Sequence, residues 1–211
     1  MTNAWTEVYD ALAPAYDQQT GRDGWWPNEA AAGLLAPLGL SASRVLDLGA
    51  GTGQTSEMLL GLYPGAAFTL VDLSARMVDV ARAKLPGATV VESDASDFLR
   101  STTDEWDMIA AIGCLELVPD LFQVLRLATS RLAPGGHLVV THEPLQGASV
   151  QAQPCSRLSG GRLVHRYARE DLERRAVSYG LMRVADRDLT AFQRGDSGED
   201  VIYKLVVWAA G

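Results

Sequence analysis

Near residue 50, three glycines alternate with other residues directly after an apolar segment, in the order Val45-Leu46-Asp47-Leu48-Gly49-Ala50-Gly51-Thr52-Gly53. Glycines in such a turn permit a tight backbone and let a ligand approach the main chain closely. The helix predicted beyond the turn presents unpaired N–H groups and the positive end of its dipole. The spacing differs from the G-x-G-x-x-G of nucleotide-binding oxidoreductases, which would need glycine at Gln54. We therefore predict a backbone cradle for a ligand, with Asp47 facing the crevice.

Two further carboxylates come at the ends of the next two predicted strands, Asp72 after Thr69-Leu70-Val71 and Asp94 after Val91-Glu92-Ser93. A carboxylate at the first position can accept hydrogen bonds from both hydroxyls of a ribose. One at the second can accept a hydrogen bond from the exocyclic amine of adenine, and the N–H of Ala95 can meet a ring nitrogen. Each acid alone could instead cap a helix or close a turn. Three acids at successive strand ends beside the glycines predict a nucleoside site.

Proton transfer has three candidate groups in the second half of the chain. His142 and Glu143 end the fifth predicted strand, where Glu143 would face a bound substrate, and His165 lies before the last predicted helix. A histidine near its free pKa suits general-base catalysis at neutral pH. Both histidines could instead have surface or hydrogen-bonded structural roles. They lack the close pairing of metal ligands, so we expect no metal site.

Strand-like segments alternate with helix-like segments and would bring these groups to one edge of a sheet. Short apolar strands are predicted over 44–48, 67–72, 88–92, 106–112 and 137–141. Helical periodicity covers 54–62, 74–85 and 121–132, and Pro134-Gly135-Gly136 predicts a turn before the fifth strand. Continuous apolar strands separated by helices indicate an α/β fold with a parallel sheet covered on both faces.

The two ends of the chain depart from this alternation. A helix is predicted over 170–179, followed by strands over 181–186 and 201–208 that the Gly- and Asp-rich loop 194–200 joins as an antiparallel pair. Residues 1–40 read as helices, with Tyr9, Leu12, Ala13 and Tyr16 on one helical face. We expect one domain over residues 1–211, in which 1–40 form a helical lid and 44–211 form the core.

Composition narrows the classes of partner. The 211 residues include 47% hydrophobic residues, which suits one globular α/β domain. The formal net charge of −8 repels phosphate backbones, so nucleic acid is not an expected partner. Cys114 and Cys155 lack the CxxC spacing of a zinc site and do not suggest a disulfide scaffold. No secretory signal and no run of about 18 apolar residues is seen, so we expect a cytoplasmic protein without a membrane partner.

Together these residues resemble the class I S-adenosylmethionine-dependent methyltransferases, over roughly residues 44–143. The glycine turn is similar to that family's first motif, Asp72 to its second and Asp94-Ala95 to its third. Residues 106–109 and 132–138 resemble the fourth strand and the turn into the fifth, while Tyr9-Asp10 and the segment 13–17 are similar to the N-terminal motif of the small-molecule branch. The resemblance implies a Rossmann-like sheet of seven strands in the order 3-2-1-4-5-7-6, with strand 7 antiparallel and helices on both faces.

The resemblance also implies S-adenosyl-L-methionine as the cofactor. Asp72 would bind its ribose and Asp94-Ala95 its adenine, against which Leu73 and Met77 would pack.

The methionine part of the cofactor is implied to lie on the backbone of the cradle, at Gly49, Ala50, Gly51 and Gly53. Gly113 would present its carbonyl oxygen to the methionine amine, and Tyr16 would close over the cofactor from the lid.

Methyl transfer is an in-line displacement, so the attacking atom, the methyl carbon and the sulfur must be nearly collinear. Aromatic faces can hold the sulfonium cation, and Tyr9, Tyr16, Trp25 and Trp26 are candidates; the tryptophans could instead pack the N-terminal helices on the core. One departure from the family lies after strand four, where many relatives have Glu-His and this chain has Leu117 in place of the histidine.

The acceptor is expected to be a small molecule that is methylated on an O, N or C atom. Two alternatives remain at this stage. The chain could be a non-catalytic S-adenosylmethionine-binding regulator or partner subunit, because binding residues do not prove turnover. It could also be an NAD-dependent oxidoreductase, although that class needs the G-x-G-x-x-G spacing.

Overall fold

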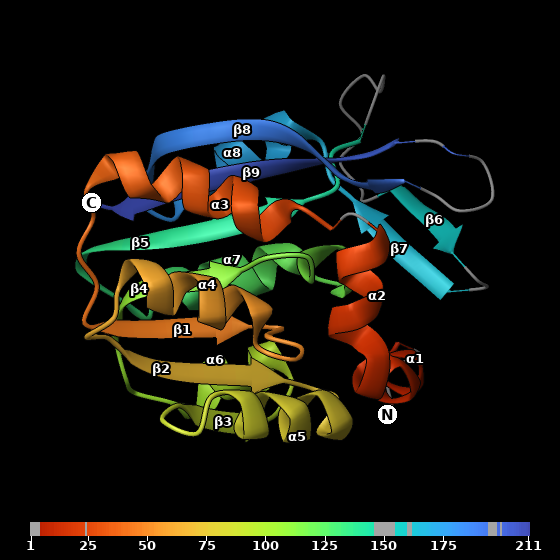
Figure 1. Ribbon diagram of the computed structural model, residues 1–211. Helices are drawn as coiled ribbons and strands as arrows, with labels where there is room; N and C mark the ends of the chain where they lie inside the picture. The colour runs from red at the N-terminus through yellow and green to blue at the C-terminus, as the bar shows by residue number, and fades with distance from the viewer. Residues whose placement is uncertain (1–4, 24, 146–154, 160–161, 194–197, 199) are drawn as a thin grey trace.

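A computed structural model of the protein describes residues 5–23, 25–145, 155–159, 162–193, 198 and 200–211. Within these residues one sheet of seven strands forms the centre, in the order β3-β2-β1-β4-β5-β9-β8 (Figure 1). The strands are β1 Arg44–Leu48, β2 Ala67–Asp72, β3 Thr89–Glu92, β4 Trp106–Ala111, β5 Leu132–His142, β8 Leu181–Gln193 and β9 Asp200–Ala210. Strands β1 to β5 are parallel, and β9 is antiparallel to both β5 and β8. Counting only this sheet, the predicted order 3-2-1-4-5-7-6 is confirmed.

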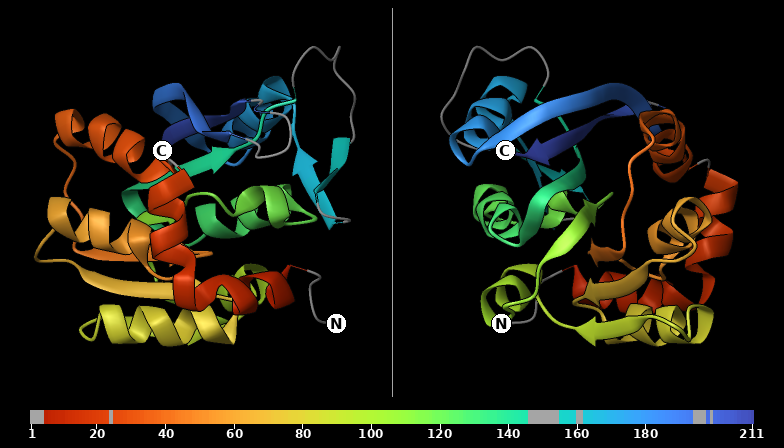
Figure 2. Two further views of the ribbon diagram at one scale, coloured as in Figure 1. Left: turned by 45° about the vertical axis from the view of Figure 1, so that its right-hand side comes forward. Right: turned by 90° about the vertical axis from the view of Figure 1, so that its left-hand side faces the viewer.

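Helices cover both faces of the sheet, as the view along the strands shows (Figure 2, right). One face carries α3 Pro27–Leu35, α4 Gln54–Leu62 and α5 Ala75–Lys84, and the other carries α6 Ala95–Ser101, α7 Leu121–Thr129 and α8 Arg169–Ser178. Because successive strand side chains point to opposite faces, Met108 of β4 joins the first core and Ile109 joins the second. Both side chains are fully buried, which explains why this strand reads as continuously apolar.

Polar caps start the helices that follow the central strands. The Ser74 hydroxyl accepts the Met77 N–H at the start of α5, and the Asp94 carboxylate accepts the Ser96 and Asp97 N–H groups at the start of α6. Asp120 caps α7 in the same way. These caps fix where each helix begins, and they place the first turns of α5 and α6 directly after β2 and β3.

The predicted turn at Pro134-Gly135-Gly136 is wrong, because these residues lie inside β5. The pairing of β4 with β5 shifts register between Trp106 and Met108, so the extra residues are absorbed as an irregularity of the ladder. A Cβ atom on Gly136 would lie 2.8 Å from the Ala133 carbonyl oxygen, so the glycine permits this close backbone approach. The strand therefore begins five residues earlier than predicted.

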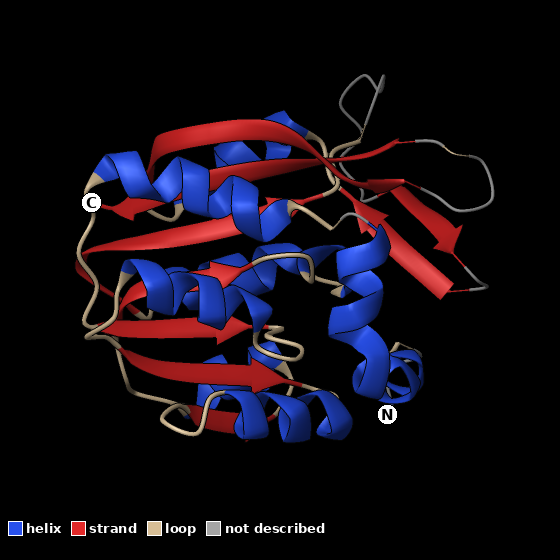
Figure 3. Cartoon of the chain, in the orientation of Figure 1, coloured by secondary structure: helices blue, strands red, loops and turns tan. Residues whose placement is uncertain are grey.

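A second, two-stranded sheet lies at the edge where β1 and β2 end (Figure 3). It consists of β6 Cys155–Ser159 and β7 Arg162–Arg166, paired antiparallel. The sequence pattern of this part of the chain predicts neither strand. Of the predicted loop 194–200, residues 194–197 and 199 lie outside the described residues, while the antiparallel pairing of β8 with β9 is confirmed.

The N-terminal residues divide between two positions. Helices α1 Thr6–Leu12 and α2 Tyr16–Asp23, with the 3-10 turn Ala13–Ala15 between them, lie at the carboxyl edge of the sheet (Figures 1 and 2). Helix α3 instead packs on the sheet, where Ala31 and Leu35 are buried in the core. The segment predicted as a lid therefore reaches the cleft through its first two helices, through Trp25 and through Asn28 at the start of α3. No helix among the described residues is long and apolar enough to cross a membrane.

Candidate active site

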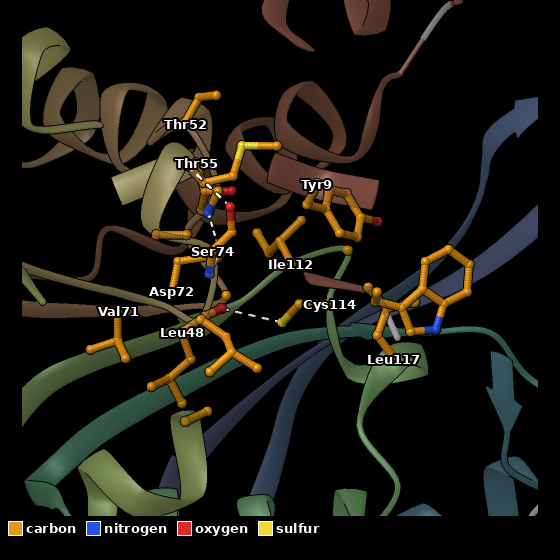
Figure 4. Close-up of a pocket in the computed structure, with 18 of the residues that line it drawn as sticks. Tyr9, Leu48, Thr52, Thr55, Val71, Asp72, Ser74, Ile112, Cys114 and Leu117 are labelled. Atoms are coloured by element: carbon orange, nitrogen blue, oxygen red, sulfur yellow. Dashed lines mark hydrogen bonds between the residues drawn. The ribbon is translucent and has the colours of Figure 1, made fainter. Parts of the chain in front are cut away.

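A cavity opens where β1, β2, β3 and β4 end and where α1 approaches the sheet (Figure 4). It encloses about 1050 Å³ of space, solvent at its mouth included. Most of the predicted cofactor and substrate residues meet in its walls: Tyr9, Tyr16, Trp25, Gly49, Ala50, Gly51, Asp72, Leu73, Met77, Asp94, Ala95 and Gly113.

The glycine turn forms the floor of the cavity. Gly49, Gly51 and Gly53 all have positive φ angles, of 64°, 55° and 84°, a backbone region that other residues enter only with strain. A Cβ atom on Gly49 would overlap the Cβ and Sγ atoms of Cys114. The first glycine is therefore required both by its backbone angles and by the side chain that packs against it.

Asp72 sits at the centre of the floor. Its Oδ2 atom accepts the Gly51 N–H at 2.8 Å, and its Oδ1 atom accepts the Ser74 N–H at 2.8 Å. Burial raises the pKa of this carboxyl, although the hydrogen bonds from Ser74 and Gly51 act in the opposite direction. Each carboxylate oxygen can accept more than one hydrogen bond, so the same group can also accept two ribose hydroxyls.

Asp94 and its neighbours form the wall after β3. Asp94 lines the cavity and also caps α6, so the structural and the ligand-binding interpretations of this residue are compatible. Ser93 and Ala95 lie beside it in the same wall, and Leu73 and Met77 complete the apolar side. This end of the cavity therefore combines a carboxylate, backbone N–H groups and an apolar surface, which is what an adenine ring requires.

Asp47 and Gly53 lie beneath the turn, outside the cavity lining. The Asp47 side chain is fully buried and accepts a hydrogen bond from the Ser56 hydroxyl of α4 at 2.7 Å. Burial raises its pKa to about 7. Gly53 is the N-cap residue of α4, and a Cβ atom there would press on Leu85 and Leu70. Both residues support the conformation of the glycine turn and do not line the cavity.

Aromatic rings form the other end of the cavity. Tyr9 and Tyr16 meet edge to face with ring centroids 6.1 Å apart, and burial raises the pKa of both phenols. Trp25 lies so close to Gly113 that a Cβ atom there would be 2.5 Å from its ring. Trp5, from the first described turn, joins the wall together with Leu117 of the 3-10 turn Leu115–Leu117, labelled η3.

Two aspartates attach α1 and α2 to the segments that follow β1 and β2. Asp10 accepts hydrogen bonds from the Ser74 hydroxyl at 2.5 Å and from the Arg76 N–H at 3.3 Å. Asp17 accepts from the Thr52 hydroxyl and from the Lys84 ammonium group. Neither aspartate was assigned a role from sequence, because the partners lie more than 30 residues away and no local spacing signals them.

Neither candidate base, His142 or His165, lines the cavity. His142 is only 1% exposed, and burial lowers its pKa to about 3. His165 lies on β7, half-buried, and burial lowers its pKa as well. A base needs contact with the acceptor, and these placements argue against that contact.

Two predicted substrate residues also fall outside the cavity lining. Trp26 is 49% exposed and occupies the N-cap position of α3. Glu143 is buried after β5. The polar pair that the sequence analysis missed is Glu116, which is buried in η3, and Tyr203 of β9, whose hydroxyl donates to the Glu116 carboxylate. No group of three or more His, Cys, Asp or Glu residues suited to a metal occurs within the described part of the chain.

Comparisons with known proteins agree with this geometry. Residues 46–138 match a family model described as a methyltransferase domain. A trans-aconitate 2-methyltransferase of Paracidovorax citrulli is 37% identical over 108 residues, which are 51% of this chain and 42% of that protein. The chain thus spans about two fifths of the length of this curated relative.

Solved structures share the fold over nearly the whole chain. The (4+2)-cyclase SpnF superposes with a TM-score of 0.74 at 16% identity, covering 97% of this chain and 95% of its own. A magnesium protoporphyrin IX methyltransferase of Synechocystis PCC 6803 with bound S-adenosylmethionine gives 0.70 at 16% identity, covering 100% of both chains. The fold is that of the class I, Rossmann-like methyltransferases. The sequence matches cover residues 46–138 of this chain and about half of it in the aligned relative.

Proposed function

We propose that this protein transfers the methyl group of S-adenosylmethionine to an O, N or C atom of a small molecule. The observation that carries the proposal is that one cavity joins two unlike ends. Asp72 and Asp94 stand at strand ends on one side, and the aromatic rings of Trp5, Tyr9 and Trp25 stand on the other. A nucleoside fits the first end, and the second leaves room for an acceptor.

The residues that would hold the cofactor fit its parts. The Gly49–Gly51 backbone would hold the methionine portion beside the Gly113 carbonyl, and Asp72 would hold the ribose. Asp94 and Ala95 would bind adenine. Support comes from the cradle at Gly49, where even a Cβ atom has no room, and from the Asp72 carboxylate that two N–H groups hold in place.

When bound, S-adenosylmethionine supplies an electrophilic methyl carbon on a sulfonium. The protein's contribution is to position the acceptor in line with that carbon and to exclude water. Tyr9 and Tyr16 have raised pKa values, so both stay protonated at neutral pH and can donate hydrogen bonds. With both candidate histidines outside the cavity lining, we propose that positioning and desolvation supply most of the catalysis.

Calorimetric titration tests the binding half of the proposal. S-adenosylhomocysteine and S-adenosylmethionine should bind with one site per chain, whereas NAD should show no heat of binding. Tight binding of NAD instead would favour an oxidoreductase, and binding of none of the three would refute the proposal.

Turnover tests the catalytic half. Release of S-adenosylhomocysteine should depend on an added acceptor and should fall when Asp72 is replaced by Ala. A protein that binds the cofactor and yet turns over with no member of a broad panel of small hydroxylated, amino and carbon-nucleophile acceptors would instead be a non-catalytic binding protein.

A further inference from the structure

We infer that the acceptor is a neutral molecule with a planar, apolar body, and not a carboxylate or another anion. The inference rests on the proposed methyl transfer and adds to it the chemical class of the acceptor. Three features of the cavity carry it: the aromatic walls of its acceptor end, the support behind one of those walls, and the sign of the charges around it.

The acceptor end can be located from the order of the strands. The loops after β1, β2 and β3 hold the cofactor residues, and the chain after β4 continues the same edge of the sheet. Beyond that point the walls are Trp5, Thr6, Tyr9, Trp25, Leu117 and Val118. Aromatic and aliphatic side chains, Leu117 among them, are thus gathered where the acceptor must lie.

Trp25 is supported from behind and so offers a fixed planar surface. Its ring stacks on Phe192 of β8, with centroids 6.0 Å apart and planes 28° apart. It also meets Tyr203 edge to face at 6.0 Å, and these residues share a small apolar cluster. A ring held by two aromatic neighbours keeps its orientation, and an aromatic wall of this kind favours a flat partner through stacking.

The charges around the cavity are negative. Asp72 and Asp94 are the two carboxyl side chains of its walls within the described residues. A third carboxylate, Glu116, is buried behind the wall and accepts the Tyr203 hydroxyl. Glu116 acts electrostatically on Tyr9, Tyr16 and Cys114, all of which line the cavity. An anionic acceptor would be repelled by these groups and would lose its hydration on entry.

No lysine or arginine among the described residues lines the cavity walls. Two cations close by have contacts of their own: the Arg162 guanidinium lies over the Trp5 ring at 5.8 Å, and Lys84 pairs with Asp17 and Glu57. A carboxylate acceptor would therefore find no cation in contact with it in the described walls.

Paired probes that differ mainly in charge test the inference. Protein saturated with S-adenosylhomocysteine is titrated at pH 7 with 2-naphthol, 2-naphthoate and trans-aconitate, followed by calorimetry and by tryptophan fluorescence. We expect 2-naphthol to bind at least about tenfold more tightly than either anion, a difference of roughly 1.4 kcal/mol. Equal or tighter binding of an anion, failure of 2-naphthol to bind, or methylation of trans-aconitate would overturn the inference.

The design separates this inference from the proposed function. If S-adenosylhomocysteine itself does not bind, the proposed function fails first. If it binds and the anions are preferred, only the acceptor class is wrong.

Two substitutions at one position sharpen the test. Leu117→Arg places a cation in the acceptor wall and should raise the affinity for 2-naphthoate relative to 2-naphthol by about tenfold. Leu117→Met keeps the apolar wall and should leave the ratio unchanged. Val177→Arg, on an exposed position of α8, adds the same charge away from the cavity and should not alter it. The wild-type comparison stands even where Leu117→Arg is poorly folded.

Discussion

Asp72 has two tasks that depend on each other. Its carboxylate accepts the N–H groups of Gly51 and Ser74 and thereby holds the glycine turn against the start of α5. The proposed ribose contacts use the remaining capacity of the same two oxygens. The group that we propose to bind the ribose therefore also holds the backbone around it.

Replacing Asp72 by Ala should weaken S-adenosylhomocysteine binding by about 100-fold or more, because hydrogen bonds to a charged group contribute roughly 1.5–3 kcal/mol each. Titration calorimetry measures the change. Asp97→Ala, which removes an exposed carboxylate paired with Arg100, is the matched control and should bind like the wild type. An unchanged dissociation constant in Asp72→Ala would show that the ribose assignment is wrong.

Asp47 makes stability depend on pH. Burial raises its pKa from 3.8 to about 7, so the folded protein holds this proton more tightly than the unfolded chain does. Its contribution is therefore fully present below about pH 4 and is lost as the pH rises to 7. Asp47→Asn keeps an acceptor for Ser56 and cannot ionise. Between pH 4 and pH 7, the free energy of unfolding of Asp47→Asn should increase relative to that of the wild type by on the order of 4 kcal/mol, as measured by urea unfolding. If the free energies of unfolding of the wild type and the variant changed in parallel with pH, this expectation would be wrong.

Gly49 should tolerate no side chain. Gly49→Ala combines a positive φ with overlap at Cys114 and should lower the free energy of unfolding by about 2–4 kcal/mol. Gly61→Ala, in α4 with no atom within 4 Å of the added Cβ, should instead stabilise by about 0.5 kcal/mol. Urea unfolding of both variants measures the two changes in free energy of unfolding. Equal changes in Gly49→Ala and Gly61→Ala would contradict this prediction.

At the scale of elements, local pattern predicted the central strands and helices well. The bounds of β1, α4 and β2 coincide with the predicted segments, because a short apolar run followed by glycines or a cap has few alternative structures. The hairpin β6–β7 and helix α6 were not predicted. Helix α6 depends on the Asp94 cap more than on its own mixed sequence, and the hairpin is anchored by tertiary contacts, including the hydrogen bond from Trp5 Nε1 to the Leu163 carbonyl.

The attachment of α1 and α2 should control ligand exchange on the cofactor side. The double variant Asp10→Ala, Asp17→Ala removes the hydrogen bonds to Ser74, Arg76, Thr52 and Lys84. Because each is worth roughly 1 kcal/mol, S-adenosylhomocysteine should dissociate about tenfold faster or more in a stopped-flow displacement experiment. Glu7→Ala, on an exposed face of α1, should leave the rate unchanged. A rate unaffected by the double variant would argue against these helices as a cover.

At the scale of the whole molecule, the two ends of the cavity differ in how far sequence could predict them. The cofactor end follows strand ends, so each residue there has a local signal. The acceptor end is assembled by tertiary packing from α1, the segment before α3 and η3. Trp5 and Val118 were therefore missed, while Trp26 was wrongly expected there. A position at a strand end, such as that of His142, does not tell which way the side chain packs.

Ligand binding should stabilise the entire fold. At 100 times its dissociation constant, S-adenosylhomocysteine should raise the free energy of unfolding by about 2.7 kcal/mol, which for a chain of this size raises Tm by roughly 5–10 °C. Differential scanning fluorimetry measures the shift. NAD at the same concentration should produce none, and a shift with NAD alone would contradict the assigned class of ligand.

The N-terminal segment makes different contacts at its two ends. This difference predicts the order in which the two products dissociate after the reaction. Its Trp5 end is joined to the β6–β7 hairpin by the indole hydrogen bond to Leu163, whereas Asp10 and Asp17 make four hydrogen bonds on the opposite side. Parting at the hairpin leaves the hydrogen bonds of Asp10 and Asp17 intact, so the methylated product should leave first and the spent nucleoside last. In steady-state kinetics, S-adenosylhomocysteine should then inhibit competitively against S-adenosylmethionine and noncompetitively against the acceptor.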